Sequence, residues 1–325
     1  MRNKMIVVVL AFGFALWAFG GPSGEEKPAL PKNLAGLAGS FDLAGPLEPA
    51  VRHYIQVTEF VQLGFDGKRK DLQTYTIKMT VVPAALSDRG GDAYTVREVL
   101  WRSGDGEAES IPELAGWSYV YKERAGDLDA DGQIFGIPHA KFRTLTTSRG
   151  KKLAGVGVYP IYNSFVDFHG FCDVFARPMA GGSGIQDLRR VGQSIRHAAA
   201  FSEPPVNLGE GIKAGSVFRN GDVRLVFKGI GVVDGAACAI VGYDSGESTL
   251  KMIMPMGPEA DIVTEGGSQY IGDIYIDLAT RWVRKVSLDE FVVTDTKLPA
   301  SAAKLQGYTV RHLLMRLVER EEFEK

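Results

Sequence analysis

The chain has 325 residues with a formal net charge of -2, and 45% of its residues are hydrophobic and 23% are charged. The near-neutral charge excludes the basic footprint of a nucleic-acid-binding protein and the acidic tail of a solvating segment. The apolar content is ample for a folded core, and after the first 20 residues no apolar run is long enough to span a membrane. We therefore expect neither a nucleic-acid partner nor a membrane span in the mature protein.

Residues 1–20 have the layout of a secretory signal peptide. Two basic residues precede an unbroken apolar run over residues 5–19, and small residues lie before a cleavage site near Gly20. The run is shorter than the ~20 apolar residues that a spanning helix needs. The segment predicts an exported protein, periplasmic or extracellular, with retention of the segment as an anchor as the alternative.

The remaining chain divides by composition. Residues 21–50 are rich in Pro, Gly and Ala without a helical or strand period, which predicts a flexible tether. Residues 51–325 are expected to form a β-rich domain. A helical segment and two prolines after it leave open a division into two lobes, residues 51–180 and 206–325.

Strand patterns dominate from residue 51 onward. Tyr75, Ile77, Met79 and Val81 alternate with polar residues, and similar alternation recurs along the second half of the chain. Asp-Gly or Asn-Gly pairs, which favour tight β-hairpin turns, occur at 66–67, 105–106, 131–132, 220–221 and 234–235. The sequence predicts a mainly β fold, an antiparallel meander that is strongly curved or half-barrel-like.

One principal helix is expected near residues 185–199. Apolar residues recur there at helical spacing, at Ile185, Leu188, Val191 and Ile195. Residues 156–178 are dense in aromatic side chains and are interpreted instead as one or two buried strands joined near Gly170. Periplasmic carriers of lipids and lipoproteins combine such a half-barrel with one helix, but no motif of such a family is present, so only the architecture is analogous.

A candidate calcium loop lies in "GDLDADGQIFG". Asp127, Asp129, Asp131 and Gly132 match the first, third, fifth and sixth positions of an EF-type loop. The twelfth position, which requires a bidentate carboxylate, is Pro138. The string is therefore interpreted as a hairpin turn, and weak calcium binding by the three aspartates is kept as a hypothesis.

A second candidate site is "VDFHGFCDVF". An extended strand would place Asp167 and His169 on one face, with Cys172 and Asp173 close by. Carboxylate, imidazole and thiolate are metal ligands, and an Asp beside a His is the orienting pair of a general base. The spacing matches no standard zinc pattern, so a satisfied histidine in an aromatic-rich strand is the simpler interpretation.

An apolar binding surface is the third candidate. Met252, Met254 and Met256 alternate on one face of a predicted strand, and methionine adapts to irregular apolar ligands. With Tyr275 and Phe165 they are the expected lining of a cavity for an apolar small molecule. Ordinary core packing is the alternative for all five residues.

The sequence lacks the patterns G-x-S-x-G, P-loop, H-E-x-x-H and C-x-x-C. It favours an exported, non-enzymatic protein that binds an apolar molecule or an envelope polypeptide in a concave sheet face. The alternatives are an exported enzyme or metal-binding protein that uses the region of Asp167 and His169, and a structural or interaction module of the cell envelope. No cofactor is expected beyond weakly bound calcium, and export leaves open whether Cys172 and Cys238 form a disulfide.

Overall fold

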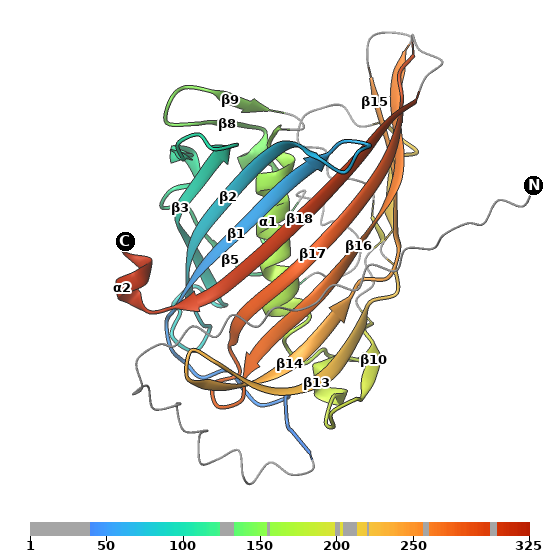
Figure 1. The fold of residues 1–325 in the computed structure, drawn as a ribbon. Helices are drawn as coiled ribbons and strands as arrows, with labels where there is room; N and C mark the ends of the chain where they lie inside the picture. The colour runs from blue at the N-terminus through green and yellow to red at the C-terminus, as the bar shows by residue number, and fades with distance from the viewer. Residues whose placement is uncertain are drawn as a thin grey trace, which may run out of the picture.

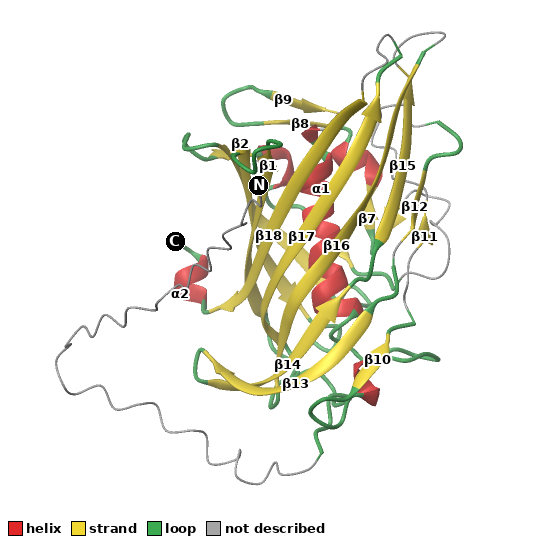
Figure 2. Ribbon diagram, turned by 45° about the vertical axis from the view of Figure 1, so that its right-hand side comes forward, coloured by secondary structure: helices red, strands yellow, loops and turns green. Residues whose placement is uncertain are grey.

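The computed structural model describes residues 40–123, 133–154, 157–198, 202–203, 213–219, 221–255, 260–299 and 304–325. Within them one 14-stranded antiparallel sheet dominates, with a single main helix against it (Figures 1 and 2). The predicted mainly β, antiparallel fold class is confirmed. The expected signal peptide and the calcium-loop aspartates lie outside the described residues.

The long strands of the sheet are β1 (Arg52–Leu63), β2 (Arg69–Val82), β3 (Ala93–Ser103), β13 (Arg224–Val233), β14 (Ala236–Asp244), β15 (Ser248–Pro255), β16 (Asp261–Asp277), β17 (Val283–Lys297) and β18 (Lys304–Val318). Its short strands are β4 (Glu109–Ser110), β5 (Ser118–Val120), β10 (Ser194–Arg196), β11 (Ser202–Glu203) and β12 (Val217–Arg219). Two small pairs stand apart from it: β6 (Gln133–Ile134) with β7 (Ile137–Pro138), and β8 (Thr144–Thr146) with β9 (Lys152–Ala154). The helical segments are α1 (Tyr159–His169), the π-helical turn η5 (Gly170–Val174), α2 (Arg320–Phe323) and the 3-10 turns η2 (Pro112–Leu114), η3 (His139–Phe142) and η6 (Ile185–Asp187).

The strand order joins the two halves of the chain in one sheet. The main path runs β10-β13-β14-β16-β17-β18-β1-β2-β3-β4, and β15 extends it from β16. The halves meet where β18 pairs with β1 over eleven residue pairs, His53↔Val318 to Leu63↔Tyr308. The end strands β10 and β4 are not neighbours, so the sheet is open, and the strong curvature expected from the sequence is not established.

Two Asp-Gly turns close hairpins where the sequence places them. Asp66 and Gly67 connect β1 to β2, with Gly67 at φ 72°. Asp234 and Gly235 connect β13 to β14, and both have positive φ, 47° and 76°, as a type I′ turn requires. These turns fix the register of both hairpins.

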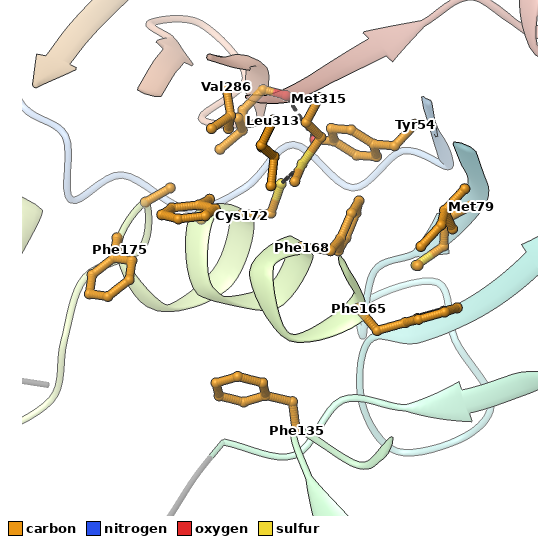
Figure 3. Packing of buried hydrophobic residues seen from close by; sticks show 14 of the residues in the cluster. Tyr54, Met79, Phe135, Phe165, Phe168, Cys172, Phe175, Val286, Leu313 and Met315 are labelled. Carbon is orange, nitrogen blue, oxygen red and sulfur yellow. Dashed lines mark hydrogen bonds between the residues drawn. The ribbon is translucent and has the colours of Figure 1, made fainter. Parts of the chain in front are cut away.

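Helix α1 packs on one face of the sheet, here called the inner face. Inner-face side chains alternate along each strand with outward-facing ones, and Tyr54, Met79, Leu313 and Met315 are among those that the core buries. Figure 3 shows Phe168 directed toward Tyr54 and Met79, between helix and sheet. The opposite surface of the same strands is the outer face.

The predicted position of the main helix is wrong. Within the described residues 185–198 the helical structure is limited to the 3-10 turn η6, after which β10 pairs with β13. Ile185 and Leu188 are buried as expected, but Val191 is 57% exposed and Gly192 has φ 85°, which breaks a helix. The apolar spacing came from a turn followed by a strand.

The helix lies instead where buried strands were expected. In α1 the buried residues Ile161, Phe165 and Phe168 recur at spacings of four and three, and Pro160 occupies the first turn, where its missing N–H costs nothing. The surrounding aromatic residues had concealed this period. None of the described helices is both long and apolar enough to cross a membrane.

Candidate functional site

Helix α1 directs Asp167 and His169 into two separate clusters. Asp167 and His169 are two residues apart, which on a helix places them about 200° apart around the axis. The expectation that they share one face of a strand is therefore wrong. Each belongs to its own buried cluster, and the two clusters are described in turn.

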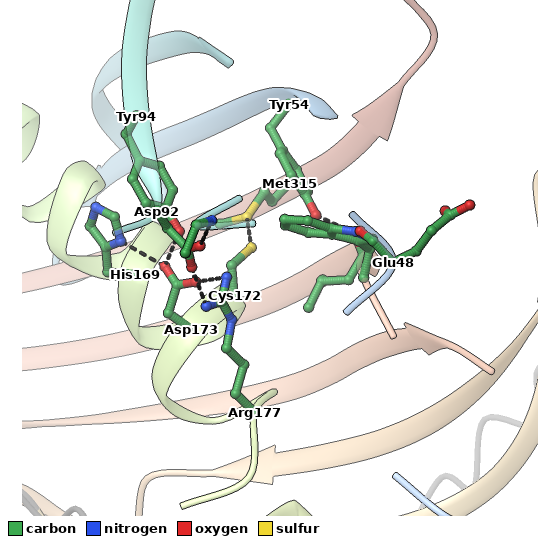
Figure 4. A network of polar contacts seen from close by, with 12 residues as sticks. Glu48, Tyr54, Asp92, Tyr94, His169, Cys172, Asp173, Arg177 and Met315 are labelled. Atoms are coloured by element: carbon green, nitrogen blue, oxygen red, sulfur yellow. Dashed lines mark hydrogen bonds and ion pairs between the residues drawn. The ribbon is translucent and has the colours of Figure 1, made fainter. Parts of the chain in front are cut away.

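The first cluster, the His169 network, links α1 and η5 to β3 and β5. Figure 4 shows Tyr94, His169 and Asp173 of this network beside Asp92 and Arg177. Its members are Asp92, Tyr94, Tyr119, His169, Asp173 and Arg177. His169 Nδ1 lies 2.7 Å from Asp173 Oδ2, and His169 Nε2 lies 2.6 Å from the Tyr119 hydroxyl. The Tyr94 hydroxyl donates to Asp173 at 2.9 Å. Arg177 lies 2.6 Å from Asp173 Oδ1 and 2.5 Å from Asp92 Oδ2.

His169 is fully buried, and both of its ring nitrogens are engaged. The rings of Tyr94, Tyr121 and Phe135 surround it, with centroids 4.6, 5.2 and 5.7 Å from the imidazole. A neutral imidazole satisfies this geometry, since Nδ1–H donates to the carboxylate and Nε2 accepts from the Tyr119 hydroxyl. In this arrangement the imidazole offers no free nitrogen to a metal ion or a substrate.

The charge balance of the His169 network favours an ionised Asp173. Burial alone would raise the pKa of this carboxyl, but the Arg177 guanidinium and the hydrogen bonds from His169 and Tyr94 lower it below its usual value. Burial raises the pKa of Tyr94 and Tyr119 well above the ordinary value, so both remain neutral donors. The network is thus a hydrogen-bonded and ion-paired structural junction between helix and sheet, in which the buried Arg177 Nε has no hydrogen-bond partner.

The second cluster, the Arg311 cluster, consists of Asp167, Tyr270, Glu290 and Arg311. Arg311 lies 2.6 Å from Asp167 Oδ2 and 2.8 Å from Glu290 Oε2, and it also donates to the Tyr270 hydroxyl. Its guanidinium carbon lies 5.0 Å from the centre of the Phe60 ring and 5.1 Å from that of Tyr270. The cluster connects α1 to three adjacent strands, β16, β17 and β18.

The Arg311 cluster holds two carboxylates for one guanidinium. Arg311 is 4% exposed and Glu290 is 8% exposed, so water offsets little of this imbalance. Burial raises the pKa of Asp167 to about 6; Arg311 opposes the shift and the nearby Glu290 adds to it. The cluster therefore carries surplus negative charge at neutral pH.

The residues predicted to line an apolar cavity do not meet. Phe165 is a fully buried residue of α1, whereas Tyr275 lies on the outer face, where Lys285 Nζ is 5.6 Å from its ring centre. Met252 and Met254 lie on the inner face of β15, in the part of the sheet that extends past α1. Met256 lies outside the described residues. Only the two described methionines share a surface.

That surface is the inner face of the strand ends that extend past α1 (Figures 1 and 2). Register places the following residues on it, and it is here called the extension face: Leu250, Met252, Met254, Ile262, Thr264, Val292, Thr294, Thr296, Leu305 and Thr309. Nine of the ten are half-buried and Leu305 is exposed. None carries a charge.

The outer face of the same strand ends is charged. Glu265 pairs with Lys251 and Lys297, and Asp295 pairs with Lys304. Because these residues alternate along the strands with those of the extension face, charge is segregated to one side of the sheet. The inner side of these strand ends therefore presents an uncharged, half-exposed face of apolar and threonine side chains.

The metal hypotheses have no support in the described residues. The calcium-loop residues Asp127, Asp129 and Asp131 lie outside them. In the part of the chain that the structure describes, no group of three or more His, Cys, Asp or Glu side chains could hold a metal ion. Cys172 and Cys238 are both free and buried, and Cys172 Sγ lies 3.0 Å from Met315 Sδ.

Sequence reasoning missed Glu290 and Arg311. Each interrupts an inner-face series that is otherwise apolar, Val286-Leu288-Glu290-Val292 on β17 and Arg311-Leu313-Met315 on β18. A charged residue at a core position of an alternating strand needs a buried partner, and this signal was present in the sequence. The partner on α1 could not be deduced without the helix.

The fold and its clusters define an open antiparallel sheet with one helix on its inner face, a class of architecture and not an activity. No protein-family model matches the chain, and no curated protein is significantly similar to it in sequence.

His197→Gln should remove an acid-sensitive part of the stability. His197 is 2% exposed, and burial lowers its pKa from 6.5 to about 4. A lowered pKa in a base means that its contribution is present above pH 6.5 and is lost as the pH falls toward 4. When the pH is lowered from 7.5 to 5.0, the free energy of unfolding should fall by about 2 kcal/mol more in the wild-type protein than in H197Q. Denaturant unfolding at the two pH values measures the difference.

Proposed function

We propose that the protein is a non-enzymatic binding protein that holds an apolar molecule on the extension face. The observation that carries the proposal is the charge segregation of the strand ends, with ten uncharged inner-face residues opposite an outer face of ion pairs. Exposed apolar area of this kind is unfavourable in water and is covered when a ligand binds. Met252 and Met254 add adaptable side chains that suit a variable hydrocarbon.

The chemistry of the face favours a hydrocarbon over an extended polypeptide. In the extension face β16 and β17 are paired along both edges, whereas β15 after Lys251 and β18 before Tyr308 are paired along one edge only. The middle of the face therefore presents side chains only. Among these, the Thr264 and Thr296 hydroxyls lie 3.0 Å apart and bond to each other. A polypeptide would bring amide groups that this surface leaves without partners, which is costly, whereas an alkyl chain brings none.

The geometry does not favour an enzyme that uses Asp167 and His169. The two side chains lie in separate clusters, and His169 is enclosed with both nitrogens bonded. Export, periplasmic or extracellular, is part of the proposal and rests on the character of residues 1–20.

Binding is tested with the neutral fluorescent dye Nile red and a pair of neighbouring substitutions on β17. Val292 lies on the extension face, and Val293, 51% exposed, lies on the outer face. Val292→Asp places a charge against the ligand and should weaken dye binding at least tenfold, or about 1.4 kcal/mol. Met254→Asp should act in the same way, whereas Val293→Asp should bind like the wild-type protein.

Competition then identifies the ligand class. Hexadecanol should displace the dye, and an alternating leucine–threonine decapeptide should not. Displacement by the peptide alone would transfer the proposal to a polypeptide ligand. Equal affinity of V292D, V293D and the wild-type protein, with circular dichroism showing that all three are folded, would rule out the extension face as the binding site.

A further inference from the structure

We infer that the Arg311 cluster is a proton-operated latch that holds α1 on the sheet more firmly at acidic than at neutral pH. The geometry of the cluster carries the inference. It connects the helix, through Asp167, to Glu290 on β17 and Arg311 on β18, and all three side chains are almost excluded from water. One guanidinium there pairs with two carboxylates.

All the charged and titratable groups that the structure places around Asp167 belong to the sheet. Tyr270 of β16 has its hydroxyl 3.4 Å from Asp167 Oδ1, and Tyr243 of β14 is also near enough for Asp167 to raise its pKa. Both tyrosines are neutral at physiological pH, since burial raises their pKa values. The balance is therefore set by Arg311 against Asp167 and Glu290.

A proton on the Asp167 carboxyl balances the cluster. The protonated cluster has one guanidinium and one carboxylate, with the neutral Asp167 still able to bond through its oxygens. The ionised cluster buries one uncompensated negative charge at the junction of helix and sheet, which is unfavourable. Burial raises the pKa of Asp167 from 3.8 to about 6, so its stabilising effect is complete below pH 3.8 and is lost as the pH rises through 6.

The position of the latch gives it a structural consequence. Val292 and Thr309 of the extension face are the next inner-face residues after Glu290 and Arg311 on the same strands. On its other side lie Phe168 and the rest of the buried contact between α1 and the sheet. Ionisation of Asp167 therefore weakens the part of the contact between α1 and the sheet that lies next to the extension face. The latch does not depend on whether an apolar molecule binds.

The test is hydrogen exchange of residues 159–174 at pH 5.0 and pH 7.5, each corrected for intrinsic exchange, in the wild-type protein and in Asp167→Asn. The ratio of protection in D167N to that in the wild-type protein should be about tenfold larger at pH 7.5 than at pH 5.0. The contribution of His197 is common to both chains and cancels in this ratio. A merely structural role for Asp167 predicts a ratio that does not vary with pH.

Glu290→Gln provides the second variant. This substitution leaves one carboxylate for one guanidinium. The ratio of protection in E290Q to that in the wild-type protein should therefore rise with pH, as it does for D167N. Glu265→Gln, on the outer face of β16 where the carboxylate pairs with two lysines, is the matched control and should keep a constant ratio. Ratios for D167N and E290Q that change by less than twofold between the two pH values would overturn the latch.

Discussion

Asp173→Asn should lower the free energy of unfolding by about 3–5 kcal/mol at pH 7, because it breaks a buried network by removing its central charge. Asp173 is 4% exposed and accepts bonds from His169, Tyr94 and Arg177 at 2.6–2.9 Å. The asparagine side chain has the same shape, but its NH₂ group would face hydrogen-bond donors. Of the two carboxylates that pair with Arg177, only that of Asp92 would remain. Denaturant unfolding followed by circular dichroism measures the effect.

Asp289→Asn is the matched control for this substitution. Asp289 pairs with His312 on the outer face, and both side chains are about half exposed. Exposed pairs of this kind contribute about 0–1 kcal/mol, so D289N should unfold almost like the wild-type protein. A loss in D173N no larger than that in D289N would contradict the structural role of the His169 network.

The pH dependence of D173N supplies a second check. The pKa of Asp173 is lowered in the folded protein, so its contribution is present above the usual value of 3.8 and is lost as the pH falls through the lowered pKa. The deficit of D173N relative to the wild-type protein should therefore be constant from pH 5 to 7 and shrink in stronger acid. A deficit that grew on acidification would indicate that Asp173 is protonated in the folded protein.

Local signals in the sequence predicted the sheet. An Asp-Gly pair supplies its own turn geometry, and at Asp234 and Gly235 both predicted positive φ angles are present. The alternation of Tyr75, Ile77 and Met79 likewise shows directly which side chains are buried. Such features depend on neighbours in the chain, so they can be recognised without knowledge of the tertiary structure.

The position of the main helix was predicted wrongly because two periodic signals compete in the sequence. Ile185 and Leu188 have helical spacing, but Gly192 and the pairing of β10 with β13 impose a turn and a strand. In α1 the helical period of Ile161, Phe165 and Phe168 was hidden by further aromatic residues, because this helix is covered on nearly every side. A buried helix and a buried strand are difficult to separate by periodicity alone.

The error in secondary structure propagated to the candidate site. On a strand, Asp167 and His169 would have shared a face; on α1 each is directed to different partners. Those partners, Arg311 and Tyr119, are 144 and 50 residues away in the chain, and only the folded sheet brings them near. For Met252 and Met254 the sequence correctly indicated a shared face, because that judgement required nothing beyond strand alternation.

Phe168→Ala should lower the free energy of unfolding by about 3–5 kcal/mol, through lost apolar burial and the cavity that remains. Phe168 is 1% exposed, and its ring lies 5.3 Å from that of Tyr54 on β1 and 6.0 Å from that of Tyr94 on β3. Phe168 therefore packs α1 against two strands. The surrounding rings are too constrained to fill the cavity that the substitution leaves. Denaturant unfolding with an unchanged m-value would attribute the loss to the folded state.

Phe291→Ala removes the same side chain from the outer face of β17, where the phenylalanine is 52% exposed, and should cost less than about 1 kcal/mol. The pair separates burial under α1 from the general effect of losing a phenylalanine in a β-rich protein. Similar losses in the two variants would mean that α1 does not form the core of the inner face. A large loss in F168A alone supports the packing on which both the His169 network and the Arg311 cluster depend, since each requires α1 to be held at this distance from the sheet.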